Sequence, residues 1–246
     1  MRTILYLFLV FSVLSSCETK SEAQKIVDQS IAAHGGKLFE KAKISFDFRE
    51  RSYEIFKSPS RFEYVRQFSD STGIIKDVLN NEGFKRTVNG ESVELPEDRV
   101  KAFSNSVNSV AYFAFLPYGL NDAAVFKEYL GETNIDGKDY HLVKVTFSED
   151  GGGEDHDDEF LYWFNKENSL IEYMAYSYHT DGGGVRFRKA IRQHEVDGLI
   201  LLDYENYKPA DKNTPVEDME TLYKAGELEL LSEILLENVK VYFMEK

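Results

Sequence analysis

The chain has 246 residues but only one cysteine, Cys17, and few basic residues for its size. A single thiol excludes an intramolecular disulfide. The 43 acidic residues outnumber the 29 basic ones, and no run of lysine or arginine occurs. Such an anionic surface repels nucleic acid and anionic lipid headgroups. We therefore expect no nucleic-acid partner and no membrane contact through surface charge.

Motifs of familiar catalytic sites are also absent from the sequence. It contains no G-x-S-x-G nucleophile elbow and no H-E-x-x-H zinc motif. It lacks G-x-G-x-x-G and the P-loop, so a nucleotide is not expected as a ligand. No catalytic residue, metal or cofactor is predicted. The sequence also lacks a linker rich in proline, glycine and serine, and it has no repeat, which favours one domain.

An apolar run opens the chain, from Ile4 to Phe11, behind the single basic residue Arg2. This run is too short to span a bilayer and is typical of a secretory signal peptide. The sequence LSSC that follows, ending at Cys17, resembles the bacterial lipobox. The resemblance implies cleavage before Cys17, lipidation of its thiol and acylation of the new amino terminus. The alternative is an ordinary signal peptide followed by an incidental cysteine.

These features predict the organisation of the chain. Residues 1–17 would be the lipoprotein signal peptide, 18–20 a short tether and 21–246 a single domain. Several acyl chains would anchor the protein to a membrane through the lipid alone. Glu18 follows the cysteine where an aspartate would signal retention in the inner membrane, so we expect a lipoprotein of the cell envelope, located at the outer membrane. Once lipidated, Cys17 leaves no thiol for catalysis.

Two segments have the pattern of helices. In residues 21–34, Ser21 and Gln24 have the spacing of a capping box, and a Gly-Gly pair supplies the stop. His34 stands just before this stop and is predicted to cap the helix C-terminus. Residues 97–115 form the second predicted helix, which Pro96 opens and the stretch FLPYGLND ends. This helix either packs on the sheet in the ordinary way or also covers a cavity as a lid.

The rest of the chain alternates between apolar and polar residues with the period of a β-strand. The pattern predicts about ten or eleven antiparallel strands, including a hairpin on Asn89-Gly90. Strands 159–164 and 170–178 have apolar residues on both faces. Such a sheet must curve around something on one face and be covered on the other. The predicted fold is mainly β (α+β): a strongly curved antiparallel half-barrel with an N-terminal helix and a mid-chain helical lid.

This combination of elements resembles the superfamily of outer-membrane lipoprotein carriers and receptors (LolA/LolB-like). Locally, the stretches IVDQSIAAHGG, FLPYGLND, YWFN and RFRKA are similar to a family of uncharacterised Gram-negative lipoproteins. The resemblance implies an unclosed barrel that holds acyl chains under a helical lid, and it supplies no catalytic residues. We therefore expect a non-catalytic protein that binds a hydrophobic or amphipathic ligand, either a lipid or a lipoprotein acyl chain. The predicted cavity wall consists of aromatic residues: Phe46, Phe48, Phe103, Tyr112, Phe113, Tyr162, Phe164, Tyr176 and Tyr178.

The stretch GGGEDHDDE, residues 151–159, matches neither an EF-hand nor a repeat-type calcium motif. Its simplest interpretation is a hydrated hairpin tip. Successive antiparallel strands place alternate loops at the same end, however, which brings this loop near residues 179–188. A polar rim could then bind a headgroup or another anion, and its residues would be His156, Asp158, His179, Asp181, Arg186 and Arg188. The alternative is that these arginines only balance the acidic loop.

Two other functions remain open at this point. A metal-assisted hydrolase at the acidic rim would require His156, His179 and at least two carboxylates to converge. A structural or interaction module of the envelope would fill the barrel with its own side chains, leaving no cavity.

Overall fold

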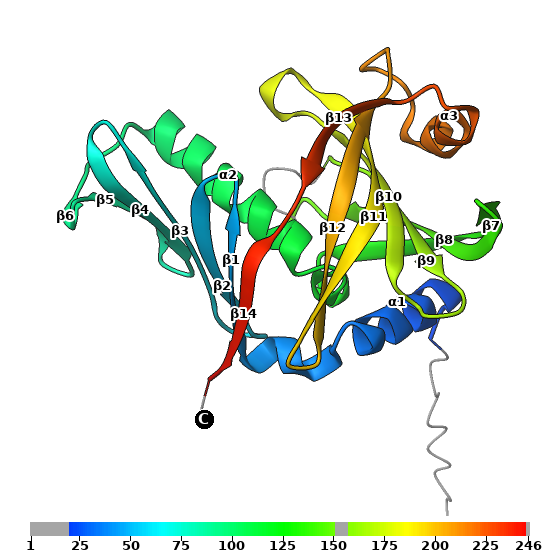
Figure 1. Ribbon diagram of the computed structural model, residues 1–246, viewed down its shortest axis with the longest axis horizontal. Helices are drawn as coiled ribbons and strands as arrows, with labels where there is room; N and C mark the ends of the chain where they lie inside the picture. Colours follow the sequence, from blue (N-terminus) through cyan, green and yellow to red (C-terminus); the bar gives the residue numbers. More distant parts are fainter. Residues whose placement is uncertain (1–19, 151–156, 245–246) are drawn as a thin grey trace, which may run out of the picture.

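A computed structural model describes residues 20–150 and 157–244 as two seven-stranded antiparallel sheets (Figure 1). The first sheet has the order β14-β1-β2-β3-β4-β5-β6, and the second has the order β13-β12-β11-β10-β9-β8-β7. The strands of the first sheet are β1 (Ala42–Phe48), β2 (Arg51–Lys57), β3 (Phe62–Asp70), β4 (Gly73–Asn80), β5 (Gly83–Val88), β6 (Glu91–Ser92) and β14 (Glu237–Phe243). Those of the second are β7 (Val125–Ile135), β8 (Lys138–Phe147), β9 (Phe160–Asn165), β10 (Ile171–Tyr178), β11 (Gly184–Val196), β12 (Leu199–Lys208) and β13 (Glu229–Ile234).

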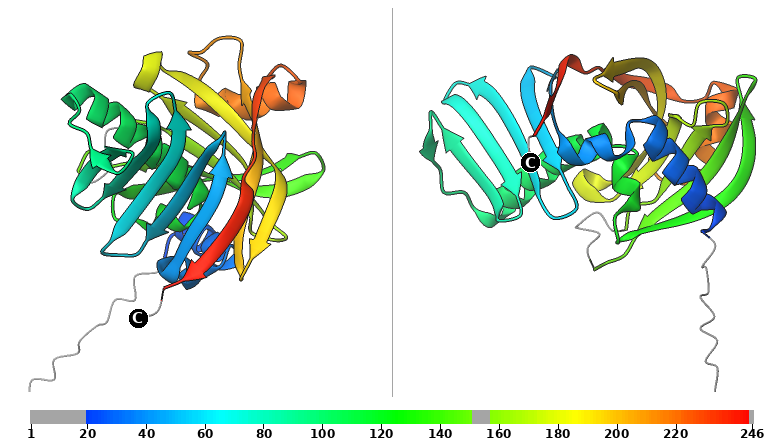
Figure 2. Two further views of the ribbon diagram at one scale, coloured as in Figure 1. Left: turned by 60° about the vertical axis from the view of Figure 1, so that its left-hand side comes forward. Right: turned by 90° about the horizontal axis from the view of Figure 1, so that it is seen from below.

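The predicted fold class is confirmed, since both sheets are antiparallel and curve without closing into a barrel. The described residues form more strands than expected. The sequence pattern does not single out β2, and the apolar C-terminal segment contains two strands, β13 and β14. This division has a structural consequence, because β13 borders the second sheet while β14 borders the first. The chain passes directly from β13 in the second sheet to β14 in the first, so these strands join the two sheets into one wall (Figures 1 and 2).

Helix α1 (Glu22–Ala33) has the predicted caps. The Ser21 hydroxyl accepts a hydrogen bond from the Gln24 N–H at 3.2 Å. His34 is the C-terminal cap and is buried, with Nδ1 2.9 Å from the carbonyl oxygen of Ser30. Gly35 follows with a φ of 123°, and a Cβ there would lie 2.5 Å from Leu199 Cδ2. Only glycine therefore allows α1 to end this close to β12.

His34 predicts a pH dependence of stability. Burial lowers its pKa to about 4 from an ordinary value of 6.5, although its bond to the Ser30 carbonyl acts in the opposite direction. Between these values the unfolded chain binds a proton that the folded chain does not, so stability falls as the pH falls. We expect the free energy of unfolding to decrease by about 3 kcal/mol from pH 6.5 to pH 4 through this group. Urea titrations across this range would measure the decrease, and His34→Gln should flatten the pH slope. An unchanged slope in the variant would contradict the assignment.

Helix α2 (Glu97–Ala114) confirms the second predicted helix to within one residue. Its buried side chains, Val107 and Ala111, belong to the hydrophobic core of the first sheet, and the helix contacts β3, β4 and β5. Short 3-10 helices lie at Gly36–Lys41 (η1), Tyr118–Asn121 (η2), Thr180–Gly182 (η3) and Val216–Asp218 (η4). The last of these leads into α3 (Met219–Ala225). Among the residues that the structure describes, no helix combines the length and apolar character needed to cross a bilayer.

The second sheet is covered on both faces, as predicted from strands that have apolar residues on both faces. All six residues of β9 are buried. Leu161 and Trp163 belong to the core cluster under α3 and η4, whereas Phe160, Tyr162 and Phe164 face α1 and the end of α2. The alternation fails in β10: Ile171 packs with the second group, not with Tyr173 and Ala175 on the α3 side. A register shift between Ile171 and Tyr173 reverses the side chain, and the sequence carries no sign of such a bulge.

Candidate functional site

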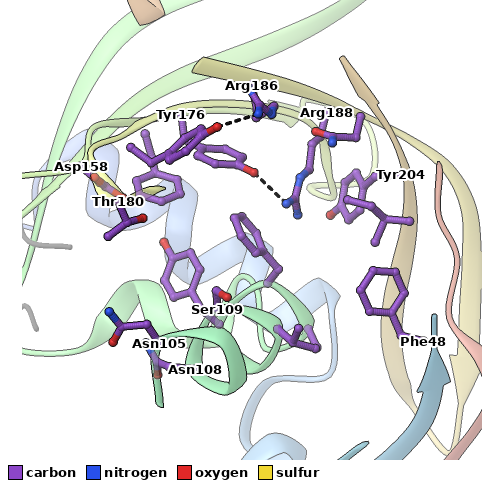
Figure 3. A pocket seen from close by; sticks show the side chains of 18 of the residues that line it. Phe48, Asn105, Asn108, Ser109, Asp158, Tyr176, Thr180, Arg186, Arg188 and Tyr204 are labelled. Carbon is purple, nitrogen blue, oxygen red and sulfur yellow. Dashed lines mark hydrogen bonds between the residues drawn. The ribbon is translucent and has the colours of Figure 1, made fainter. Parts of the chain in front are cut away.

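A cavity of about 780 Å³ lies between α2 and the second sheet, bordered by β1 and the link between β13 and β14 (Figure 3). This volume is within the range of sites that enclose a small-molecule ligand. Phe46 and Phe48 of β1 contribute to its wall, and Tyr204 of β12 lies between Phe48 and the arginines of β11. The module with a filled core predicted no such space, so the cavity argues against that alternative.

Helix α2 contributes a polar stripe to the cavity and, near its C-terminal end, also the aromatic side chains of Tyr112 and Phe113. The lining residues Lys101, Ser104, Asn105, Asn108 and Ser109 have the spacing of one helical face. The opposite face carries Val107 and Ala111 and is buried against the first sheet. The polar spacing is visible in the sequence, but by itself it resembles an ordinary solvated face. Only the position of α2 across the wall shows that this face borders a cavity.

The predicted aromatic residues divide into lining and supporting groups. Those that line the cavity are Phe46, Phe48, Tyr112, Phe113, Tyr176 and Tyr178. Tyr162 and Phe164 are fully buried behind this lining. Phe103 lies elsewhere: its ring is 6.3 Å from that of Phe84, and the Arg86 guanidinium is 3.7 Å from its centroid.

A pair of tyrosines, Tyr112 half-buried and Tyr162 fully buried, fixes the last turn of α2 to the sheet. The hydroxyl oxygens of Tyr112 and Tyr162 are 2.7 Å apart. Burial raises the pKa of both phenols, so both remain neutral at physiological pH. The rings of Tyr112 and Phe160 are 5.5 Å apart, and Phe160 stacks on Tyr176 at 5.3 Å. This aromatic cluster forms a rigid apolar surface at one side of the cavity.

The predicted polar rim is brought together only in part. Asp158 Oδ1 lies 3.2 Å from Nδ1 of His179, and Asp158 lines the cavity. The Lys212 ammonium donates to the Gly182 carbonyl oxygen at 2.9 Å, so the loop after β12 does approach the loop after β10. Arg186 and Arg188 lie in the cavity wall. His156 and the side chain of Asp181 lie outside the described part of the chain.

No three His, Cys, Asp or Glu side chains within residues 20–150 and 157–244 are grouped so that they could hold a metal ion. The hydrolase alternative also needs His156, which is not among these residues.

The sequence matches the profile of a "Family of unknown function (DUF6503)" over residues 2–238. No curated protein matches the chain. Among solved structures, a LolA superfamily protein from Nitrosomonas europaea is similar, with 11% identity, a TM-score of 0.51 and coverage of 92% of this chain and 96% of that one. A DUF1329 family protein from Desulfovibrio piger also has 11% identity, with a TM-score of 0.42 and coverage of 90% and 93%. At these identities the likeness concerns the fold alone.

Proposed function

The chain belongs to the family of unknown function DUF6503, and since it has a LolA-like fold, we propose that it binds a hydrophobic or amphipathic ligand in its cavity without catalysing a reaction. The observation that carries the proposal is the cavity itself. A space of about 780 Å³ lined by Phe46, Phe48, Phe113 and Tyr176 offers apolar surface that an acyl chain would remove from water. The fold likeness supports the same idea, because the similar protein is a LolA superfamily protein and the sequence resembles the lipoprotein carriers of that superfamily.

The cavity is suited to a lipid in a second respect. Its lining combines apolar side chains such as those of Phe48 and Tyr176 with the polar stripe of α2. A ligand that is apolar at one end and polar at the other can satisfy both kinds of surface, whereas a simple hydrocarbon would place apolar atoms against the Asn108 amide.

The proposal includes anchoring in the outer membrane through lipid on Cys17, which lies outside the described residues. Anchoring would keep the cavity near the membrane from which a lipid is taken or to which it is delivered. The intact mass of the purified chain tests this part, since cleavage before Cys17 and acylation change the mass in defined steps.

Ser109 provides the test of ligand binding, because it lines the cavity from α2 (Figure 3). Native mass spectrometry of the gently purified protein should reveal co-purifying lipid. We expect Ser109→Trp to fill the cavity and reduce the bound lipid at least about tenfold, because the indole occupies the space of an acyl chain. Because Ser109 is exposed, this substitution should change the protein's free energy of unfolding by no more than about 0.5 kcal/mol.

The matched control is Ala102→Trp, an exposed position of the same helix that does not line the cavity. This variant should keep the lipid content of the parent protein. Absence of lipid from the parent protein after extraction, or equal lipid content in all three proteins, would refute the proposal.

A further inference from the structure

The described lining of the cavity has a net positive charge although the chain as a whole is acidic. Among the described residues, the charged side chains of the lining are four basic and one acidic, namely Arg49, Lys101, Arg186, Arg188 and Asp158. Over the whole sequence, acidic residues outnumber basic ones by 43 to 29. The sign of the charge therefore reverses between the surface and the cavity, and a cavity for a purely apolar ligand would not need this reversal.

Arg188 is the most deeply placed of these cations, with 8% of its surface exposed. Its Nη2 donates to the Tyr176 hydroxyl at 2.8 Å, and its guanidinium lies 3.7 Å from the ring centroid of Phe113. Nε is buried and has no hydrogen-bond partner. Within the described residues, Arg188 contacts no carboxylate. Figure 3 shows the guanidinium directed into the cavity.

The other two arginines of the cavity have neutral partners as well. Arg186 donates to the Tyr178 hydroxyl at 2.6 Å and to the Val185 carbonyl oxygen at 2.8 Å. Arg49 donates to the Ser232 hydroxyl at 3.4 Å. Neither forms an ion pair with any residue in the described part of the chain.

Elsewhere this protein pairs arginine with aspartate where the two meet inside the fold. Arg66 and Arg86, which are 3% and 10% exposed, both bind Asp77. A buried guanidinium without a counterion is unfavourable, because the lost hydration is not replaced by an opposite charge. Among the described residues, Arg188 is thus an exception, and the anion that it lacks there is the group that a ligand would bring.

A second unsatisfied group lies beside Arg188. Asn206 faces it across the β11–β12 pair, and the Asn206 side-chain oxygen is buried without a partner. Its amide nitrogen donates to the Ser232 hydroxyl at 3.3 Å, which directs the oxygen away from that strand. The wall therefore offers cationic donors and one neutral acceptor at a single place, a set that fits an oxygen-rich headgroup better than an acyl chain.

We infer that the ligand is an acidic lipid whose carboxylate or phosphate binds Arg188 and Arg186, with its acyl chain extending toward Phe46 and Phe48. This inference rests on the proposed function and narrows the ligand to a lipid with an anionic headgroup. The acyl chain of a lipoprotein carries no such group to bind the two arginines. The guanidinium of Arg188 can form a charge-assisted hydrogen bond through its second terminal nitrogen.

Binding of radiolabelled palmitate and hexadecanol to the delipidated full-length chain tests the inference. The two probes have the same chain length and differ in the charge of the headgroup. We expect palmitate to bind at least about tenfold more tightly than hexadecanol. Arg188→Gln should weaken palmitate binding by about tenfold to a hundredfold and leave hexadecanol binding nearly unchanged. Lys189→Gln removes the same charge from the next residue, whose side chain lies over the Tyr223 ring, and should change neither affinity.

The possible outcomes separate this inference from the proposed function. Equal affinity for palmitate and hexadecanol in the parent protein would overturn the headgroup assignment while leaving lipid binding intact, and this comparison requires no variant. Binding of neither probe would overturn both. Acetate or inorganic phosphate that displaces palmitate at comparable concentrations would identify a site for small anions and would also overturn the acidic lipid.

Discussion

Replacing Asp77 by alanine is expected to lower the free energy of unfolding by about 3–5 kcal/mol. The Asp77 side chain is fully buried, and its carboxylate accepts four hydrogen bonds from Arg66 and Arg86, at 2.6–2.9 Å. Without it, two guanidinium groups that are 3% and 10% exposed would lose their only anion in the described structure. Urea unfolding of the parent protein and Asp77→Ala measures the difference.

The same variant should also weaken ligand binding, because this cluster positions α2. Arg66 Nη1 donates to the Ser106 hydroxyl at 2.7 Å and so ties the helix to β3. Glu82→Ala is the matched control, since Glu82 pairs with Lys85 on the surface and should contribute less than about 1 kcal/mol. A loss for Asp77→Ala no larger than this control would contradict the argument.

Replacing Asp203 by alanine is also expected to lower the free energy of unfolding by about 3–5 kcal/mol, because Asp203 lies at the junction of the two sheets. The carboxylate is fully buried and lies 2.9 Å from Nε2 of His194. It also accepts a hydrogen bond from the Leu236 N–H at 2.8 Å, in the link between β13 and β14. Arg192 binds the same carboxylate but is half exposed, so its share of the stabilisation is smaller.

Hydrogen exchange at the Leu236 amide locates this effect. In Asp203→Ala the amide loses its acceptor and should exchange faster, and urea unfolding should show the lower stability. Asp203→Asn keeps an oxygen for the Leu236 N–H and should retain much of the protection while losing the ionic contribution. Unchanged exchange in Asp203→Ala would show that the carboxylate does not hold the junction.

Both aspartates illustrate a limit of sequence reasoning about this fold. Nothing in the spacing of Asp77 or Asp203 distinguishes them from the many acidic residues on the surface. Each becomes important because strand pairing brings arginine, histidine or a backbone N–H from another segment beside it. The cavity-lining stripe of α2 is an intermediate case. The helical spacing of these polar residues can be recognised in the sequence, but the surface that they face cannot.

The sequence by itself determined the elements that depend on neighbouring residues. These are the caps of α1, the bounds of α2, and the strands of the second sheet that are apolar on both faces. Periods of 3.6 and 2 residues and the residues at turns encode them locally, which is why the antiparallel half-barrel and much of its aromatic wall could be predicted.

The tertiary structure alone decided the character of the cavity. It buried Phe164 behind the wall, moved Phe103 away from it and turned the polar face of α2 inward. It also gathered Arg49, Arg186 and Arg188 in one place without carboxylate partners in the described chain. Whether an arginine is paired depends on segments far apart in the sequence, so an acidic chain can form a cationic cavity that its composition does not reveal.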